Sequence, residues 1–423
     1  MGRKRDSVRT DLKLPLYHVI EEVASGRKAN TALHNTLKTS GLQDEDRARL
    51  AVISYSTLRF WWAVSSDIGT NDPKRIADAA LHLFARQKDR REVGKVPDLS
   101  EALLSASRAR CPEEVPPDIA WSSVPEWLED HLVNGLGKER ALRFLQDSLL
   151  RPVSLTLRAN SLLSTREKVM EGLRNEGINA LGSELVPTAM TVPDGTRMDH
   201  LEAFRGGLVE VQDLSSQIAC SLSLKGLSAR HVVDACAGNG GKTLALGALM
   251  ENKGVIVSID PNERALLRLK QRAKRAQVWN YERLHLDDPS KLQKYRGWAD
   301  MVLVDAPCSG LGTLRKNPDI KLHLKKEDIG RFSSVQSSLL KTYSELVRKG
   351  GRLVYCTCTI GAEEDQDVVQ RFLREERGFK LEDAGSMEPA LPRDMFQAEF
   401  FSTLPSDLGS GFFTAVMTRS KEM

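Results

Sequence analysis

The sequence predicts a multidomain protein with three parts: a helical domain over residues 1–148, a small α+β domain over 149–228, and an α/β domain over 229–423. Three observations support this division. Apolar residues recur at helical spacing in the first part, alternate with polar residues in the second, and form short runs followed by helical segments in the third. A chain of 423 residues is long enough for two or three domains of ordinary size.

The N-terminal part has the spacing of amphipathic helices. One face collects apolar residues at positions i, i+3, i+4 and i+7: Leu16, Val19, Ile20 and Val23. This spacing places side chains on a single face of a helix. No alternating strand pattern interrupts the helical spacing before the second part, so we expect this domain to be all helical.

The pattern changes after Arg151. Val153, Leu155 and Leu157 alternate with polar residues, as in a strand with one buried face. A helical segment and strand-like segments near 183–192 and 207–212 follow. These features predict a small α+β domain that leads into the third part.

Charge and composition limit the class of protein. No apolar run approaches the roughly 18 residues that a transmembrane helix needs, so we expect no membrane partner. The net charge of +4 permits an RNA partner without indicating one. Six cysteines are too few for a secreted disulfide scaffold, and the start of the sequence lacks a signal-peptide pattern. We therefore expect a cytoplasmic protein, and we expect it to be a monomer.

The third part contains short apolar runs that end in an acid. The runs that end at Asp234, Asp260 and Asp305 alternate with helical segments, which predicts a parallel, doubly wound sheet of the Rossmann-like type. A further segment ends at Asp287. Ligands bind such sheets beyond the carboxyl ends of the strands, where these acids lie.

A glycine-rich turn follows the first of these runs. A P-loop would need glycine at Cys236, and the dinucleotide fingerprint would need glycine at Thr243, so the turn matches neither motif. Asp260 is placed to bind ribose hydroxyls, and Asp287 lies near the expected adenine edge. A nucleoside cofactor without phosphates fits S-adenosylmethionine. The simpler alternative is a loop that only turns the chain, but acids at three successive strand ends favour the cofactor.

Two cysteines follow the last two strands, Cys308 shortly after Asp305 and Cys358 shortly after Cys356. A thiolate that adds to carbon 6 of a pyrimidine makes carbon 5 nucleophilic enough to take a methyl group. An acid beside the ring holds it while charge develops, and a base must then remove the proton from carbon 5. Two thiols and an aspartate supply these roles.

The other cysteines receive a simpler interpretation. We expect Cys111, Cys220 and Cys236 to be small buried hydrophobic residues. The pair Cys356 and Cys358 could suggest a metal, but a zinc site needs about four ligands and no His or Cys cluster stands near it in the sequence. We therefore predict no metal.

Several strings resemble the RNA 5-methylcytosine methyltransferases of the RsmB (Sun/Fmu) and NOP2-NSUN type. Residues 305–312 read Asp-Ala-Pro-Cys-Ser-Gly-Leu-Gly, and residues 357–359 read Thr-Cys-Thr. Residues 234–243 resemble the first motif of this family, and residues 157–160 resemble its Leu-Arg-x-Asn strand. The resemblance covers nearly the whole chain and implies a class I S-adenosylmethionine-dependent methyltransferase domain.

The resemblance also implies a role for each residue of the site. Cys358 would be the nucleophile, Cys308 would assist product release, and Asp305 would face both the base and the cofactor. The residues implied for the cofactor are Cys236, Ala237, Gly238, Asn239, Gly240, Gly241, Lys242, Asp260, Arg264, Asp287 and Asp305. Asp288 directly follows Asp287 and is an alternative contact for adenine.

The sequence departs from the family at the glycine turn, where Gly238-Asn239 replaces Ala-Pro, and at Thr359, which replaces Ser. Neither change removes a backbone donor of the turn, so we expect cofactor binding to survive. Two basic runs are ambiguous. We interpret 268–275 as a solvated face, whereas Arg315 and Lys316 follow the cysteine loop and favour RNA contact.

The resemblance implies that the substrate is a cytosine of rRNA, in particular small-subunit rRNA. The N-terminal helices resemble a NusB-like RNA-binding domain at residues 46–48 and 55–59. The same chemistry on tRNA is one alternative, and a catalytically inactive RNA-binding ribosome assembly factor is another. A DNA cytosine methyltransferase would use Cys308 as nucleophile and carry a Glu-Asn-Val motif, which this sequence lacks. A small-molecule methyltransferase would leave the first half of the chain without a purpose.

Overall fold

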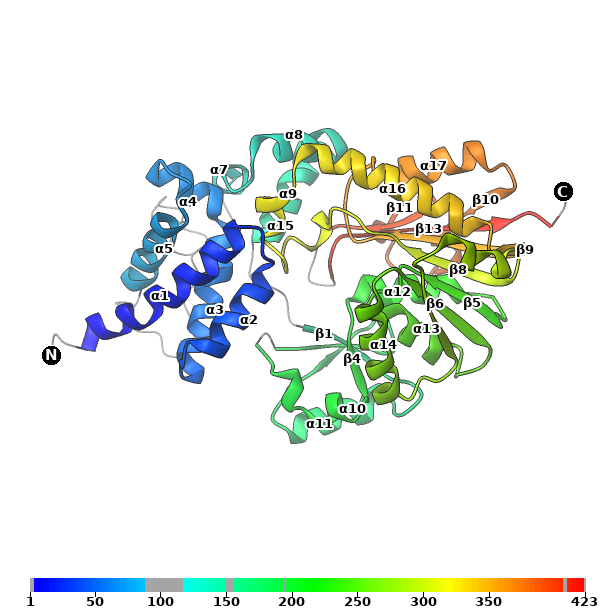
Figure 1. Ribbon diagram of the computed structural model, residues 1–423, viewed down its shortest axis with the longest axis horizontal. Helices are drawn as coiled ribbons and strands as arrows, with labels where there is room; N and C mark the ends of the chain where they lie inside the picture. The colour runs from blue at the N-terminus through cyan, green and yellow to red at the C-terminus, as the bar shows by residue number, and fades with distance from the viewer. Residues whose placement is uncertain (1–3, 88–116, 150–154, 194, 406–408, 422–423) are drawn as a thin grey trace. The chain divides into compact units, whose positions relative to one another are not determined.

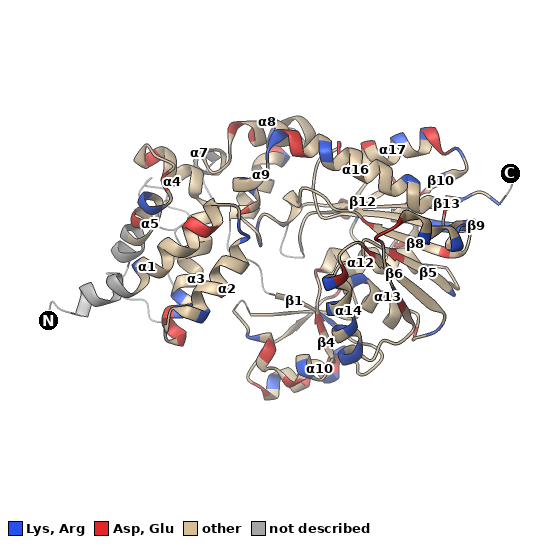
Figure 2. Cartoon of the chain, viewed as in Figure 1, with Lys and Arg blue, Asp and Glu red and all other residues tan. Residues whose placement is uncertain are grey.

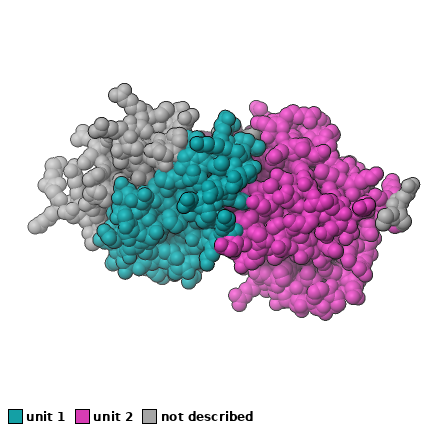
Figure 3. Space-filling view, turned by 90° about the horizontal axis from the view of Figure 1, so that it is seen from above, with its two compact units in different colours: residues 1–151, 313–326 teal, residues 152–312, 327–423 magenta. Residues whose placement is uncertain are grey.

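The computed structural model describes residues 4–87, 117–149, 155–193, 195–405 and 409–421 (Figure 1). The chain forms two compact units, one of residues 1–151 with 313–326 and one of residues 152–312 with 327–423 (Figure 3). The predicted α+β and α/β parts therefore share one unit. The prediction of 229–423 as one continuous domain differs from the structure, because 313–326 groups with the helices.

The first unit is built of helices in its described residues. Its helices are α1 (Lys4–Ala24), α2 (Ala29–Thr39), α3 (Asp44–Arg59), α4 (Trp61–Ile68), α5 (Pro73–Gln87), α7 (Pro117–Ser122), α8 (Glu126–Leu136), α9 (Lys138–Leu149) and α15 (Ile320–His323). The predicted apolar face of α1 is fully buried, and so are Leu50 of α3, Phe144 of α9, and Phe60 between α3 and α4. The expectation of a helical N-terminal part is confirmed for these residues.

The segment 313–326 is held in this unit by polar contacts. The main-chain N–H of Ala29 donates to Asp319 Oδ2 at 3.2 Å. The Lys321 ammonium donates to the carbonyl oxygens of Arg59 and, at 2.6 Å, of Ser123. The segment begins directly after the loop that carries Cys308.

The second unit begins with a small antiparallel sheet of order β2-β3-β1-β4. Its elements are β1 (Leu155–Ala159), α10 (Arg166–Asn175), β2 (Leu181–Gly182), β3 (Ala189–Val192), η1 (Met198–His200), α11 (Glu202–Arg205) and β4 (Val209–Val211). Leu157, Val169 and Val209 lie in its own apolar cluster. The strands expected near 183–192 and 207–212 are present but shorter.

The large sheet has the order β11-β12-β13-β9-β8-β5-β6-β7, and β10 pairs with β13. The strands are β5 (His231–Ala235), β6 (Val255–Asp260), β7 (Tyr281–His285), β8 (Ala299–Asp305), β9 (Val347–Thr357), β10 (Phe379–Glu382), β11 (Phe396–Gln397), β12 (Phe400–Thr403) and β13 (Phe412–Arg419). Strands β5 to β9 pair in parallel, as predicted, but β13 pairs antiparallel with β9. The sheet is therefore mixed, which corrects the expectation of a parallel sheet.

Helices cover both faces of this sheet (Figure 1). They are α12 (Leu214–Leu224), α13 (Gly241–Leu249), α14 (Glu263–Ala276), α16 (Lys326–Ser344), α17 (Gln366–Glu375) and α18 (Ala384–Met387), with the 3-10 turns η2 (Pro289–Tyr295), η3 (Leu311–Thr313) and η4 (Arg393–Met395). Alternate residues of a strand point to opposite faces. Val233 accordingly packs with Tyr343 of α16, whereas Val232 packs with Ile218 of α12.

Two further properties follow from the described residues. Among them no helix is both long and apolar enough to cross a membrane. The chain order places a topological switch point between β5 and β8, because the chain leaves β5 toward β6 on one side and later returns to β8 on the other. Ligands of open α/β sheets bind at such a point, beyond the carboxyl ends of the strands.

Candidate active site

The two predicted thiols meet at this edge of the sheet. Cys308 lies in the loop after β8, and Cys358 lies directly after β9. Their sulfur atoms are 3.4 Å apart and share a hydrogen bond. The next residues also pair, since the hydroxyls of Ser309 and Thr359 are 2.6 Å apart. Thr359 thus keeps the hydroxyl of the serine that it replaces in the resemblance.

The surroundings of the two thiols differ. The hydrogen bond from Cys308 lowers the pKa of Cys358 and Lys242 lowers it further, against the opposing effects of burial and of the Asp305 charge. The same hydrogen bond and burial raise the pKa of Cys308, and Glu364 adds to this rise. The thiolate is the nucleophilic form of cysteine. Cys358 is therefore the thiol whose surroundings favour the nucleophile.

Lys242 and Asp305 form an ion pair beside the thiols, with Nζ and Oδ2 2.5 Å apart. The Lys242 side chain is 9% exposed and that of Asp305 is 33% exposed. Burial disfavours the charged lysine, but Asp305, together with Cys356 and Cys220, outweighs this effect and the pKa of Lys242 is raised. The ammonium also lies 5.3 Å from the centre of the Phe412 ring. A charged lysine next to Asp305 leaves an exposed carboxylate edge that can face a ligand.

The glycine-rich turn is held by the next strand and by α14. Asp260 at the end of β6 accepts from the main-chain N–H of Gly238 and of Asn262, each at 2.8 Å. Gly240 has a φ of 82°, and a side chain there would collide with Leu269. The turn therefore needs glycine at this position both for its left-handed backbone and for its packing against α14.

Asp234 is a buried acid at the start of this turn. Thr243 donates a hydrogen bond to its Oδ2 at 2.6 Å. Its Oδ1 has no hydrogen-bond partner among the described residues. Burial is the main cause that raises the pKa of Asp234 to about 7. In the sequence Asp234 ends an apolar run and begins the segment that resembles the first family motif, but nothing in the sequence around it indicates that its carboxyl group is buried.

The remaining predicted cofactor residues lie farther along the same edge. Asp287 pairs with Lys291, and Asp288 accepts from the main-chain N–H of Ser290 at 2.8 Å. Both acids thus have partners in their own segment. Arg264 lies exposed in the first turn of α14.

The basic run of α14 is only partly a solvated face (Figure 2). Arg272 and Arg275 both pair with Glu210 of β4, which is 2% exposed. Lys270 and Lys274 are exposed, as expected. The two arginines hold the small sheet against α14, which corrects the interpretation of the whole run as solvated. The expected RNA contact of Arg315 also conflicts with the structure, because that side chain is buried.

The cysteines expected to be buried behave unequally. Cys220 is fully buried, as expected, whereas Cys236, in the glycine-rich turn, is only half-buried and has a positive φ of 60°. Cys111 lies outside the described residues. Over the described ranges there is no group of three or more His, Cys, Asp or Glu side chains that could hold a metal ion.

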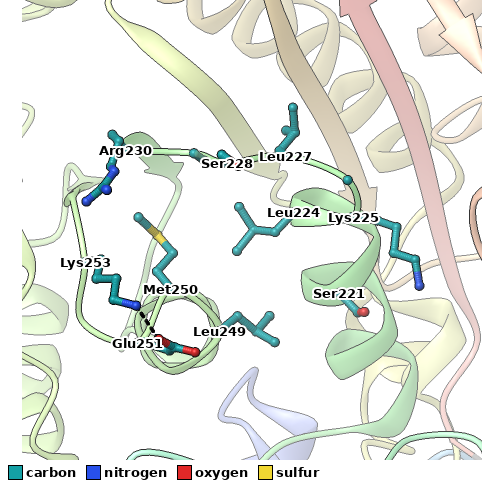
Figure 4. A pocket seen from close by; sticks show the side chains of 12 residues that line it. Ser221, Leu224, Lys225, Leu227, Ser228, Arg230, Leu249, Met250, Glu251 and Lys253 are labelled. Carbon is teal, nitrogen blue, oxygen red and sulfur yellow. Dashed lines mark hydrogen bonds and ion pairs between the residues drawn. The ribbon is translucent and has the colours of Figure 1, made fainter.

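A separate hollow of about 510 Å³ lies at the other edge of the sheet (Figure 4). It is lined by the ends of α12 and α13 and by the segment before β5, including Leu224, Met250 and Lys253. Arg230 in its wall immediately precedes the first residue of β5. The hollow therefore lies at the amino end of β5, away from the thiols, and does not belong to the candidate site.

The site sits in a region that matches a known family. A family model described as 16S rRNA methyltransferase RsmB/F matches residues 221–418, and one described as an RsmF/B-like ferredoxin-like domain matches residues 124–199. The second match begins within the helical part and ends before β4, so its bounds differ from the predicted 149–228.

Relatives and solved structures agree with this match. A probable ribosomal RNA small subunit methyltransferase B of Bacillus subtilis is 28% identical over 98% of this chain and 99% of its own length. A ribosomal RNA small subunit methyltransferase B of Xylella fastidiosa is 32% identical over 78% of this chain and 74% of its own length. The crystal structure of PH0851 is 25% identical, covers 96% of this chain and 98% of its own, and has a TM-score of 0.76.

The structure of NSun6 from Pyrococcus horikoshii with SFG shares the fold, with a TM-score of 0.63 at 22% identity over 71% of this chain and 99% of its own. The thiol pair, the acid-terminated strands and the glycine turn are thus found in a chain whose sequence matches small-subunit methyltransferases over most of its length. The chain belongs to the RsmB/F family of rRNA methyltransferases.

Proposed function

We propose that this protein transfers a methyl group from S-adenosylmethionine to carbon 5 of a cytosine in small-subunit rRNA. The observation that carries the proposal is the thiol pair, Cys308 and Cys358 at 3.4 Å, beside the Lys242–Asp305 ion pair. Two close thiols with opposite pKa shifts suit a reaction that needs a nucleophile and a second group for release. The names of the relatives support rRNA as the substrate.

The edge of the sheet at β5 and β6 fits the cofactor. Asp234 Oδ1 is a buried acceptor without a partner among the described residues, which suits the cofactor's ammonium group. The turn over Cys236–Lys242 brings backbone close to a ligand, and Asp260 is placed for ribose hydroxyls. Asp287 or Asp288, with Arg264, would line the adenine end. Bound there, S-adenosylmethionine supplies an electrophilic methyl group.

The chain's own residues would act in a defined order. The Cys358 thiolate forms a bond to carbon 6 of the cytosine, and carbon 5 then takes the methyl group. Asp305 accepts a hydrogen bond from the exocyclic amine of the cytosine and so holds the ring in place, while Lys242 pairs with the same carboxylate. A general base then takes the proton from carbon 5, whose C–H electron pair re-forms the double bond between carbons 5 and 6, and Cys308 assists release by donating a hydrogen bond to the departing Cys358 sulfur. The bond between Cys358 and carbon 6 then breaks, which releases the methylated base and restores the thiolate.

A covalent trap tests this order. Cys308→Ala protein is incubated with S-adenosylmethionine and small-subunit rRNA and run on a denaturing gel. We expect a slow-migrating protein–RNA band, because the adduct forms but cannot be resolved. The double variant Cys308→Ala/Cys358→Ala should give no band. The double variant Cys308→Ala/Cys220→Ala, which lacks a buried thiol outside the site, should still give it.

Other outcomes identify other functions. A band from Cys358→Ala alone would reverse the thiol roles and favour the DNA-type order. A band with tRNA and none with rRNA would move the substrate to tRNA. RNA binding without any band or methyl transfer would indicate an inactive assembly factor.

The roles of the domains belong to the same proposal. We assign the helical part to RNA binding of the NusB-like kind, and the small sheet to RNA contact next to the catalytic part. The protein would work as a cytoplasmic monomer without a metal.

A further inference from the structure

Glu364 is a buried carboxylate between the two cysteine loops. It is 1% exposed and lies just before α17, six positions after Cys358 in the chain. Its main-chain carbonyl accepts from the Tyr355 hydroxyl at 2.6 Å, which fixes the turn against β9. Such a carboxylate is costly to bury unless several donors reach it. The donors that reach the Glu364 carboxylate come from the two cysteine loops and from α16.

Two donors to Oε1 of Glu364 connect it to the residues on both sides of Cys308. The main-chain N–H of Ser309 donates to Glu364 Oε1 at 2.9 Å. Gln336 of α16 donates from Nε2 to the same oxygen at 2.9 Å and to the Pro307 carbonyl at 3.0 Å. The residue before Cys308 and the residue after it are therefore both tied to Glu364, one directly and one through Gln336.

The second loop reaches the other carboxylate oxygen. Thr359, the residue after Cys358, donates to Glu364 Oε2 at 3.5 Å and also pairs with the Ser309 hydroxyl. One carboxylate thus contacts the neighbour of each thiol. Hydrogen bonds to a charged acceptor are stronger than neutral ones, and here they converge on a dry site.

We propose that Glu364 is a positioning residue that holds the loops of Cys308 and Cys358 together so that their sulfur atoms meet. This role rests on the proposed function, because it serves the two-thiol reaction. The close approach of the two sulfur atoms, however, can be tested in the protein without RNA. The hydrogen bonds of Glu364 reach Ser309, Gln336 and Thr359, so it acts on the thiols through these residues. Its negative charge also helps to raise the pKa of Cys308.

The closest test measures the thiol pair directly. Diamide, a mild thiol oxidant, is added to the full-length protein without RNA or cofactor, and the Cys308–Cys358 disulfide is followed by mass spectrometry of the linked peptides. We expect rapid coupling in the wild type and a slowing of about 10-fold or more in Glu364→Ala. Glu364→Gln keeps one oxygen in place and should restore most of the rate. Glu363→Gln removes the charge of the exposed neighbour and should change nothing.

Steady-state kinetics give a second readout. For Glu364→Ala we expect kcat to fall about 100-fold, which is the scale of a small misplacement of reacting groups. The KM for S-adenosylmethionine should stay within about twofold, because the hydrogen bonds of Glu364 described above go to the cysteine loops and to α16. A purely structural role would instead lower the melting temperature and leave kcat per folded molecule unchanged in both Glu364 variants.

The outcomes separate this proposal from the proposed function. Unchanged coupling and unchanged kcat in Glu364→Ala would overturn the positioning role. If disulfide formation is slowed in Glu364→Ala while the wild-type protein methylates no RNA, the positioning role is supported and the proposed function is rejected. If Glu364→Ala does not fold, Gln336→Ala replaces it, because it cuts the link to Pro307 and should slow coupling by itself; an unchanged rate there would also count against the role.

Discussion

Lys242 in the catalytic unit and Lys321 in the helical unit are both buried, yet their surroundings shift the pKa of the two lysines in opposite directions. Lys242 is 8% exposed, pairs with Asp305, and has a raised pKa. Lys321 is 3% exposed, donates to two main-chain carbonyls, and burial together with the positive charge of Arg59 lowers its pKa to about 7.

The difference shows that the partner, and not burial alone, decides the charge of a lysine. A carboxylate offsets the loss of water around the ammonium, whereas carbonyl dipoles do so only in part. A neutral amine has two N–H groups, which match the two carbonyls around Lys321. We infer that Lys242 is kept charged for the reaction, whereas Lys321 serves to fasten the segment that follows the Cys308 loop.

Replacing Lys242 should have the largest effect in this comparison. In Lys242→Met the Asp305 carboxylate loses its partner and Cys358 loses the cation that favours its thiolate. We expect methyl transfer to fall by about 100-fold or more, the scale of removing a charge-stabilising donor from an active site. The pH at which iodoacetamide alkylates Cys358 should also rise. Methyl transfer is measured on the purified protein with rRNA, and alkylation of Cys358 is measured on the purified protein without rRNA.

The control for this variant is another paired lysine outside the site. Lys253 pairs with Glu251 at 2.5 Å, with both side chains largely exposed. Lys253→Met should leave methyl transfer and the alkylation profile unchanged. Equal losses in the two variants would mean that the Lys242 charge has no special role.

The effect on Lys321 should appear in stability rather than in activity. Its pKa is about 7 when folded and near 10.5 when unfolded, so between these values the unfolded chain binds more protons. The free energy of unfolding should therefore rise with pH above 7, by up to about 1.4 kcal/mol per pH unit. Lys321→Met has no such group and should lose this slope. The slopes of the wild type and of Lys321→Met are measured by urea unfolding between pH 7 and 9, with amide hydrogen exchange in α3 as the probe.

A slope that is the same in wild type and Lys321→Met would contradict a neutral buried lysine. Lys325, which lies in the same segment, offers a matched variant. Lys325→Met should keep the wild-type slope.

The sequence predicted the position of the two thiols better than the direction of β13 or the burial of Lys321 and Glu364. Apolar runs that end in Asp234, Asp260 and Asp305 mark parallel strands, and the carboxyl ends of parallel strands meet at one edge, so the two thiols could be expected near each other. The direction of β13 could not be expected, because a buried strand has the same apolar pattern whether it pairs in parallel or antiparallel.

Two of the residues that the sequence did not single out, Lys321 and Glu364, share a physical reason. Lys321 lies in a basic run and Glu364 in an acidic one, and such runs are usually solvated. Burial of each depends on a partner far away in the chain, such as the Arg59 carbonyl for Lys321 and the Ser309 N–H for Glu364. Local sequence carries no record of a partner 262 residues away.

The smallest effect in this comparison should come from an exposed basic residue at the same turn. Arg268 of α14 donates from Nε to Asn239 Oδ1 at 2.7 Å, and both residues are exposed. Water competes for this contact, so Arg268→Ala should change the free energy of unfolding by less than about 1 kcal/mol. Because Asp260 holds the turn at Gly238 independently, the KM for S-adenosylmethionine should rise by less than about threefold. A loss comparable to that of Lys242→Met would mean that the exposed side of the turn, and not its buried ion pair, controls the site.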